Sequence, residues 1–316
     1  MTARIPLILD CDPGHDDALA IVVALARPEL DLLAITTVAG NAGLAETTRN
    51  ACRVLTLLGR TEIPVAAGAV GPLLRSLHVA ADVHGASGLE GADLPEPAFD
   101  VRPEGALELL RTTVLAASAP VVIAAVGPLT NIALLVRIYP EVLERIHSIR
   151  VMGGAITEGN VSAAAEFNIW QDPEAAHIVL ECGRPITLMT LDATHQALFT
   201  EADVVRLEAL GTQVATVFAD LLRYFGQFHR RRYGWDGSPI HDALVVAHLA
   251  VPELVKSQSY RVEVERVSEL TRGRTVVDLH GLTGLSANAD VGLEVDRERF
   301  IDLLIEAVAR VGAVAR

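Results

Sequence analysis

The stretch Ile8-Leu9-Asp10-Cys11-Asp12-Pro13-Gly14-His15-Asp16-Asp17-Ala18 decides the fold. The apolar run from Ile5 to Leu9 predicts a buried strand, and the run from Ala18 to Ala26 predicts a buried helix. Pro13 and Gly14 mark a turn between the two. A strand that leads through a turn into a helix is typical of α/β proteins, which place their ligands at the carboxyl ends of their strands.

This turn carries four aspartates within residues 10–17. Carboxylates so close together repel one another and are costly to bury without compensation. Oxygen-only sites built from aspartate suit calcium or magnesium, and the start of a helix adds a favourable dipole for negative charge. The alternative is a solvated acidic turn. Four carboxylates at a strand end favour a metal or ligand site over that alternative.

Composition and charge exclude several classes of protein. The chain has 316 residues, of which 51% are hydrophobic, and its net charge of -14 argues against a nucleic-acid partner. No segment has the length and apolar character of a membrane span, and the first strand begins at once, which leaves no room for a signal peptide. Three widely spaced cysteines form neither a disulfide framework nor a zinc pattern. We therefore expect a cytoplasmic protein without membrane contact.

Strand-like and helical runs alternate through the first two thirds of the chain, which predicts a mainly parallel, Rossmann-like central sheet flanked by helices. With no repeat or low-complexity linker, we expect one α/β domain over residues 1–316. The expected strands are Ile5–Leu9, Leu32–Val38, Val121–Val126, Ile149–Met152, Ile186–Leu191, Tyr260–Val264 and Thr275–Asp278. The expected helical regions are Asp17–Ala26, Ala45–Leu58, Pro103–Ala117, Asn131–Arg137, Pro173–Cys182, Glu201–Tyr233, Pro239–Leu249 and Arg297–Ala309. The segment Gly68–Pro97 is expected to be a loop-rich excursion near the site.

Polar groups follow several of these strands. Asn41 could orient a water or hydroxyl, although a helix cap is an equal alternative. The carbonyl of Val126, exposed by a Gly-Pro turn, suits calcium, which accepts backbone oxygens. Two glycines after Met152 let a ligand approach the backbone closely.

Two further clusters lie downstream. Asn160, Glu166 and Asn168 offer donors and acceptors suited to the hydroxyls of a sugar, although a polar loop is the simpler interpretation of this segment alone. His241 and Asp242 open an apolar helix as a titratable pair. Such a pair is more often structural than catalytic, and an aspartate there is also a good cap.

Together these motifs resemble the inosine-uridine-preferring nucleoside hydrolases, or nucleoside N-ribohydrolases. The matching elements stand in family order between residues 10 and 242: the Asp-Cys-Asp-Pro-Gly-His-Asp-Asp opening, Asn41, Val-Met-Gly-Gly-Ala at 151–155, Asn160 with Glu166-Phe167-Asn168, and His241-Asp242. The resemblance implies calcium-dependent hydrolysis of the N-glycosidic bond of ribonucleosides through an oxocarbenium-like transition state.

The resemblance also implies roles for individual residues. The calcium ligands would be Asp12, Asp17, Asp242 and the carbonyl of Val126, with Asp10 supporting them. Asp12 would activate a calcium-bound water that Asn41 orients, and His241 would protonate the leaving base. The substrate-binding residues would be Asp16, Met152, Asn160, Glu166, Phe167 and Asn168. Because calcium would anchor the vicinal diol, the resemblance implies discrimination against 2′-deoxyribose.

The side of the site that holds the nucleobase is less well marked. Residues 76–90 and 223–236 are expected to cover the leaving group, with His84 facing the base and Gln227 or His229 at its edge. An amphipathic helix with its aromatic residues in the core is an equal alternative for the second segment. The presence of His241 favours a non-specific or pyrimidine-preferring enzyme. Family members are usually homodimers or homotetramers, so we expect a homo-oligomer.

Two alternatives remain open. The Asp10-Cys11-Asp12 opening is similar to that of haloacid-dehalogenase-type phosphatases, but these need a downstream lysine or arginine, and the one lysine here, Lys256, lies in an unremarkable context. A non-catalytic, calcium-dependent ribose-binding protein is the other alternative. The presence of Asp12, Asn41 and His241 together argues against it.

Overall fold

The predicted first strand, β1 (Ile5–Cys11), is an interior strand of a nine-stranded sheet in the computed structural model, which describes residues 4–314. It pairs in parallel with β2 (Leu30–Thr37) on one side and β4 (Val121–Ala125) on the other. Leu7 and Leu9 belong to the hydrophobic core on one face of the sheet, and Ile8 belongs to the core on the other face. The continuous apolar run of β1 therefore reflects burial on both faces, as parallel sheets require.

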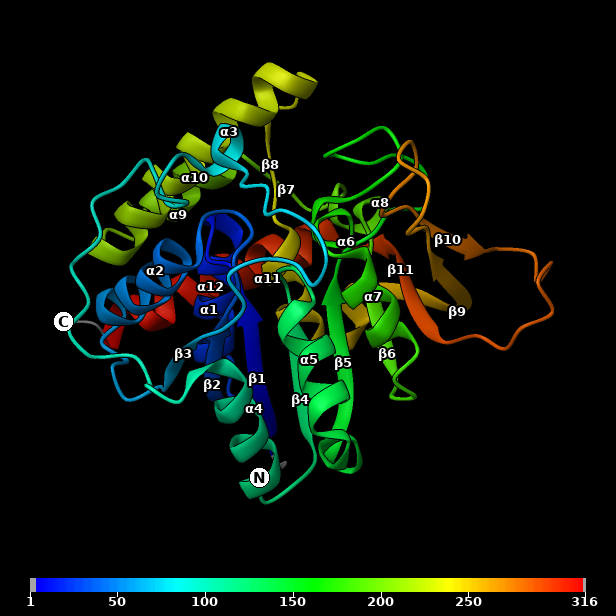
Figure 1. The fold of residues 1–316 in the computed structure, drawn as a ribbon. Coiled ribbons are helices and arrows are strands. Elements are labelled where there is room, and N and C mark those ends of the chain that lie inside the picture. The colour runs from blue at the N-terminus through cyan, green and yellow to red at the C-terminus, as the bar shows by residue number, and fades with distance from the viewer. Residues whose placement is uncertain (1–3, 315–316) are drawn as a thin grey trace.

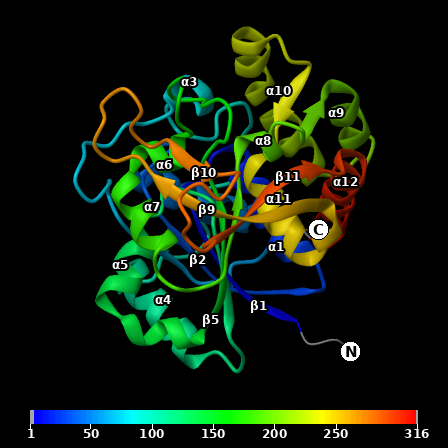
Figure 2. The same ribbon diagram turned by 90° about the vertical axis from the view of Figure 1, so that its right-hand side faces the viewer.

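The strand order in the large sheet is β10-β9-β11-β6-β5-β4-β1-β2-β3. The strands from β11 to β3 run parallel to their neighbours, whereas β9 pairs antiparallel with both β11 and β10. Figure 2 shows the β9–β11 group from its own side of the molecule. Two short strands form a separate antiparallel pair, β7 (Leu198–Thr200) with β8 (Gly237–Pro239). The remaining strands are β3 (Val65–Ala67), β5 (Ile146–Met152), β6 (Ile186–Met189), β9 (Val255–Val264), β10 (Thr275–Asp278) and β11 (Ala289–Val295).

Helices cover both faces of the sheet (Figure 1). One face carries α1 (His15–Ala26), α2 (Leu44–Leu57), α11 (His241–Ala250) and α12 (Arg297–Val314). The other face carries α4 (Gly105–Ala116), α5 (Thr130–Ile138), α7 (Pro173–Leu180) and the 3-10 helix η1 (Pro140–Arg145). The other helices are α3 (Ala81–His84), α6 (Phe167–Gln171), α8 (Leu191–Thr194), α9 (Glu201–Glu208), α10 (Gln213–Tyr233) and the 3-10 helix η2 (Pro252–Leu254).

The predicted α/β architecture is confirmed, and each predicted strand and helix has a counterpart in the structure. The predicted strand Ile186–Leu191 is too long, because Leu191 already begins α8. The strand β11 was missed, although its apolar residues alternate, as expected for a strand with one polar face. Its position beside β6 joins the predicted β9 and β10 to the main sheet. The segment 68–97 is loop-rich as predicted, with α3 as its one helix.

The parallel topology places the carboxyl ends of the strands from β1 to β6 along one edge of the sheet. The helix α10 lies beyond this edge, together with the loop segment that carries α3 (Figure 1). Among residues 4–314, no helix is long and apolar enough to span a membrane.

Candidate active site

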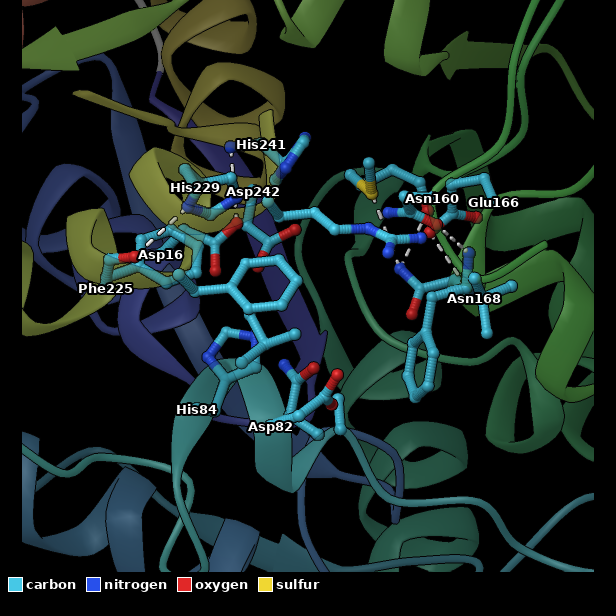
Figure 3. A pocket seen from close by; sticks show the side chains of 18 of the residues that line it. Asp16, Asp82, His84, Asn160, Glu166, Asn168, Phe225, His229, His241 and Asp242 are labelled. Atoms are coloured by element: carbon cyan, nitrogen blue, oxygen red, sulfur yellow. Dashed lines mark hydrogen bonds between the residues drawn. The ribbon is translucent and has the colours of Figure 1, made fainter. Parts of the chain in front are cut away.

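A cavity of about 380 Å³ opens at the carboxyl edge of the sheet. Figure 3 shows Asp16, Asp242 and His241 on one side of it and Asn160, Glu166 and Asn168 on the other. Its lining also includes Asn41, His78, Asp82, His84, Val126, Met152, Phe167, His195, Phe225, Phe228, His229, Arg232, Tyr233 and neighbouring loop residues. The structure thus brings residues from several strand ends, loops and helices, predicted from separate motifs, to one cavity.

Three carboxylates meet at one side of this cavity. Asp16, Asp17 and Asp242 each offer an oxygen within 4.8 Å of the others, and all three side chains are buried. Asp16 and Asp17 lie in the first turn of α1, and Asp242 lies in the first turn of α11. Asp17 accepts hydrogen bonds from the backbone N–H groups of Asp12 and Gly14, at 3.1 and 2.9 Å. Two helix N-termini therefore face the same negative charge, which their dipoles stabilise.

Asp12 lies beside this cluster, buried and fixed by the loop after β2. Its Oδ2 accepts the backbone N–H of Asn41 at 2.7 Å. The Asn41 amide donates to the Asp12 carbonyl at 3.2 Å and to Asp17 Oδ2 at 3.1 Å, so this side chain joins the two aspartates. Neither Asp12 nor Asp17 lines the cavity itself. Asn41 is thus a positioning group as well as a cavity residue.

Burial without a counter-ion dominates the electrostatics of the cluster. Desolvation raises the pKa of Asp12 and Asp242 well above the ordinary value, and it raises the pKa of Asp16 to about 7. No lysine or arginine within residues 4–314 forms an ion pair with these carboxylates. Several buried carboxylates with no protein cation and only oxygen donors are what a bound divalent cation requires.

Asp10 lies one layer below the cluster. Its Oδ1 accepts hydrogen bonds from Thr36 at 2.5 Å and Asn131 at 2.8 Å, while its buried Oδ2 has no partner. Asn131 was not singled out from the sequence. It also donates to the Thr37 carbonyl at 3.0 Å, so it links β1, β2 and α5 beneath the cavity.

Two glycines leave the space that the Asp12 carboxylate occupies. A Cβ built on Gly127 would lie 2.5 Å from Asp12 Oδ1, and one built on Gly40 would collide with Asp12 Oδ2. Both glycines follow strand ends, one after β2 and one after β4, and the two loops approach each other closely. The space between Gly40 and Gly127 that holds the Asp12 carboxylate is called the slot below. Neither position can carry a side chain without moving the carboxylate.

The resemblance makes Asp12 a reacting group, and a shift of about 1 Å at such a group lowers a rate about a hundredfold. We therefore expect Gly40→Ala to reduce the kcat of the implied hydrolysis by about that factor. Gly43→Ala is the matched control, since a Cβ on Gly43 meets nothing within 4 Å. Steady-state rates of the two variants, with thermal denaturation to verify folding, provide the measurement. Equal rates for both variants would contradict the proposed slot.

The opposite side of the cavity is built around Glu166, which caps the short helix α6. Its carboxylate accepts the backbone N–H groups of Asn168 at 2.8 Å, Gly154 at 3.0 Å and Ile169 at 3.1 Å. Desolvation raises its pKa to about 7 despite these bonds. Asn160 accepts the backbone N–H of Phe167 at 2.9 Å, so the sugar-binding candidates form one connected unit.

Asn168 connects this unit to the strand ends. Its amide nitrogen donates to the carbonyls of Val126 at 2.7 Å and Met152 at 3.2 Å. With both amide hydrogens directed at the backbone, its amide oxygen is left as the group for a ligand. The Val126 carbonyl keeps a second lone pair, so this bond does not exclude its use as a metal ligand.

The remaining lining comes from α10 and the loop segment 68–97. Phe225, Phe228, His229, Arg232 and Tyr233 line the cavity at helical spacings of three and four residues, which defines one face of α10. Gln227 is off this face, exposed and absent from the lining, so the structure does not place this predicted base contact at the cavity. The sequence signal for the residues of α10 that line the cavity was this periodicity.

Burial disfavours the charged form of four histidines at or beside the cavity. Burial lowers the pKa of His15 and His229 to about 4 and that of His84 and His241 well below the ordinary value. His241 begins α11, and its Nδ1 lies 2.7 Å from the Thr194 hydroxyl. His195, next to Thr194, lines the cavity and was not predicted.

Lys256 does not serve this site. It lies in β9, exposed, and pairs with Glu294 at 2.7 Å. A phosphatase of the haloacid-dehalogenase type would need a lysine or arginine beside the carboxylates. Arg232 lines the cavity from α10. No lysine or arginine within residues 4–314 forms an ion pair with Asp12, Asp16, Asp17 or Asp242, so the structure does not favour that alternative.

Comparison with known proteins gives a consistent result. The family model for inosine-uridine preferring nucleoside hydrolase matches residues 7–302. The pyrimidine-specific ribonucleoside hydrolase RihA of Escherichia coli is 50% identical over 303 residues, which cover 96% of this chain and 97% of that protein. The solved purine-preferring ribonucleoside hydrolase from Gardnerella vaginalis has a TM-score of 0.92 at 32% identity, over 98% of this chain and 99% of the other. The plant nucleoside hydrolase PpNRh1 has a TM-score of 0.87 at 32% identity, over 97% and 99%.

Proposed function

This chain belongs to the inosine-uridine preferring nucleoside hydrolase family, and we propose that it cleaves pyrimidine ribonucleosides with water to give free base and ribose. The observation that carries the proposal is the cavity between a buried carboxylate cluster and a polar wall suited to a sugar. The preference for pyrimidine bases is supported by the 50% identity to RihA, which is named pyrimidine-specific. The expected leaning toward pyrimidines thus becomes a specific proposal.

The ribose is proposed to lie between the two walls of the cavity. Asp16 would accept hydrogen bonds from the 2′- and 3′-hydroxyls, and the free amide oxygen of Asn168 would accept from the same diol. Asn160 and Glu166 would bind the 3′ and 5′ side. Phe167 and Met152 complete the contact with the sugar. As the glycosidic bond breaks, the ribosyl group gains positive charge, which the surrounding carboxylates stabilise.

Asp12 is the proposed general base, taking a proton from the attacking water. Its carboxylate is fixed by the Asn41 backbone and by the slot between Gly40 and Gly127, so it needs no reorganisation during the reaction. Asn41 would orient the same water through its side chain.

His241 is the proposed general acid for the departing base. The Thr194 hydroxyl has no other hydrogen-bond partner among residues 4–314, so we assign its proton to the bond with His241 Nδ1. The proton of the neutral imidazole then resides on Nε2, from which it can be donated.

We propose calcium as the resident metal, held by Asp12, Asp17, Asp242 and the Val126 carbonyl with Asp10 in support. The residues fit such an ion because they are buried, oxygen-only and without a protein counter-ion. Asp16, assigned above to the ribose, also offers an oxygen to this cluster. When bound, the ion supplies Lewis-acid polarisation and neutralises the cluster.

We also propose a cellular location and an oligomeric state for this protein. A cytoplasmic location is supported by three free cysteines, of which Cys11 and Cys52 are buried. A homodimer or homotetramer is supported by the resemblance to the family. Size measurement in solution tests the second point.

A reducing-sugar assay across uridine, cytidine, inosine, guanosine, adenosine and their 2′-deoxy forms tests the proposed function. We expect release of ribose to be fastest from uridine and cytidine. The 2′-deoxy forms should react at least about a hundredfold more slowly, because buried groups that bind the 2′-hydroxyl are left unpaired. Binding of uridine without release of ribose would contradict the proposal and support a ribose-binding protein.

A further inference from the structure

His15 lies in the Asp-rich turn but has no part in the chemistry proposed above. Its imidazole is fully buried and stacks on Phe225 of α10, with ring centroids 5.1 Å apart and an interplanar angle of 3°. In the plane of the ring, Nδ1 lies 3.0 Å from Nδ1 of His84, and Nε2 lies 2.8 Å from the carbonyl oxygen of Glu90. Both ring nitrogens of His15 are therefore engaged within the protein.

The Glu90 carbonyl determines where the proton of His15 resides. A carbonyl oxygen can only accept, so Nε2 of His15 carries the proton of the neutral ring, and its Nδ1 holds a lone pair. The facing Nδ1 of His84 must then donate, because two lone pairs 3.0 Å apart would repel. A neutral His84 with its proton on Nδ1 has an unprotonated Nε2.

That unprotonated nitrogen is the one available to a ligand. His84 lines the cavity, and its Nε2 has no hydrogen-bond partner among residues 4–314. The competing donor to His84 Nδ1 is the backbone N–H of His15 at 3.4 Å, which is a longer and weaker contact than the 3.0 Å imidazole pair. The shorter contact is therefore taken to set the tautomer.

The surrounding packing prevents His84 from turning away. A Cβ on Gly14 would lie 2.6 Å from His84 Nδ1, so the imidazole packs directly on the backbone of the Asp-rich turn. Tyr224 donates to the Glu90 carboxylate at 2.9 Å, which ties α10 to the same loop. Gly85, directly after His84, has a φ of 79°, a conformation that favours glycine.

We propose that His15 is a positioning residue that fixes the tautomer of His84, so that His84 Nε2 accepts a hydrogen bond from an N–H group of the nucleobase. This inference rests on the proposed function and deepens it, because it names a chemical feature by which the base is recognised. The base of uridine has one such group, N3–H. An unprotonated Nε2 cannot supply a proton, so His84 recognises the base and is not the general acid.

The tautomer can be measured directly by ¹⁵N NMR of the metal-loaded protein labelled at histidine. We expect a pyridine-type Nε2 and a pyrrole-type Nδ1 for His84, assigned by their loss in His84→Phe. His15→Phe keeps an aromatic ring against Phe225 but removes the acceptor, so the His84 signals should move to averaged positions. His15→Asn, whose amide oxygen can replace Nδ1 as acceptor, should retain the wild-type pattern. A pyrrole-type Nε2 in the wild-type protein would overturn the proposal.

Tyr224→Phe is the matched control for this experiment. It removes the hydrogen bond to the Glu90 carboxylate but leaves the Glu90 carbonyl and both imidazoles in place. The His84 signals should therefore be unchanged in this variant. A change as large as that in His15→Phe would show that loop packing sets the tautomer, and would overturn the role of His15.

Kinetics with uridine and 3-methyluridine test the recognition of the base. His15→Phe should lower kcat/KM for uridine about tenfold, the value of one hydrogen bond, and should change it little for 3-methyluridine, which lacks the N3–H. His15→Asn should restore the uridine rate. An equal loss with both substrates would overturn recognition through N–H. Absence of ribose release from every nucleoside would instead refute the proposed function and leave the NMR result standing.

Discussion

Replacing Asp12 by asparagine is expected to lower kcat for uridine about 10³-fold, because the variant removes the proposed general base and one carboxylate of the metal site. The substitution is nearly isosteric. The amide oxygen of the new side chain can still accept the Asn41 backbone N–H that now bonds to Oδ2. The fold and the slot between Gly40 and Gly127 should therefore be retained.

The measurement is the rate of ribose release by Asp12→Asn at saturating uridine and calcium, with the melting temperature of the same sample. Asp31→Asn is the control, because Asp31 is a half-exposed carboxylate paired with Arg4 at 3.0 Å, and neither residue lines the cavity. It should react at the wild-type rate. Wild-type activity in Asp12→Asn would remove Asp12 from the mechanism, whatever its effect on stability.

Removal of divalent metal with a chelator is expected to abolish ribose release and to lower the melting temperature by roughly 5 °C. A ligand present at a hundred times its Kd stabilises the folded state by about 2.7 kcal/mol, which corresponds to a shift of that size for a chain this long. The physical cause is the repulsion between Asp12, Asp16, Asp17 and Asp242 once their counter-ion is absent. Added calcium should restore both properties.

The metal-free protein should also depend on pH in a defined direction. Burial raises the pKa of Asp16 from 3.8 to about 7, so the folded chain holds a proton that the unfolded chain has lost. The stability of the metal-free protein therefore falls as pH rises between these two values. The metal-loaded protein should show the opposite trend over this range, because the ligands must lose their protons to bind the ion. Calorimetry of both forms from pH 4.5 to about 7 makes the comparison.

Retained activity in the presence of excess chelator would contradict the proposed metal site. Restoration by magnesium as complete as that by calcium would contradict the proposed identity of the ion. Magnesium dehydrates reluctantly and keeps several waters, whereas a cluster of several protein oxygens suits calcium.

The sequence predicted the elements whose signal is local. The strand β1 and helix α1 follow from one apolar run on each side of the Asp-rich turn, and burial on both faces makes such runs continuous. The carboxylate cluster followed from the spacing of Asp16 and Asp17, because both lie in the first turn of one helix. Asp242 was predicted as a third member of the cluster only from the resemblance to the family. No local sequence pattern reveals that α11 packs against α1.

The sequence could not show which side chains of one helix or loop point toward residues of another. Gln227 was chosen for its chemistry, but the cavity face of α10 is set by helical phase, which favours His229. Asn131 looked like an ordinary helix residue, and its contact with Asp10 depends on a separation of 121 positions. The tautomer of His84 likewise depends on Glu90 and His15 meeting across two loops.

In the proposed binding mode, the ribose and the base contact parts of the chain that differ in how freely their residues can be substituted. The ribose side is made of strand ends and two helix N-termini that share buried bonds, so a substitution there disturbs its neighbours as well. The base side is one face of α10 and one loop that rests against it. Exchange of a few residues on that helix face could redirect the choice of nucleobase while the bond-breaking chemistry stays intact. Selection, natural or in the laboratory, therefore has a short and separable route to new substrates.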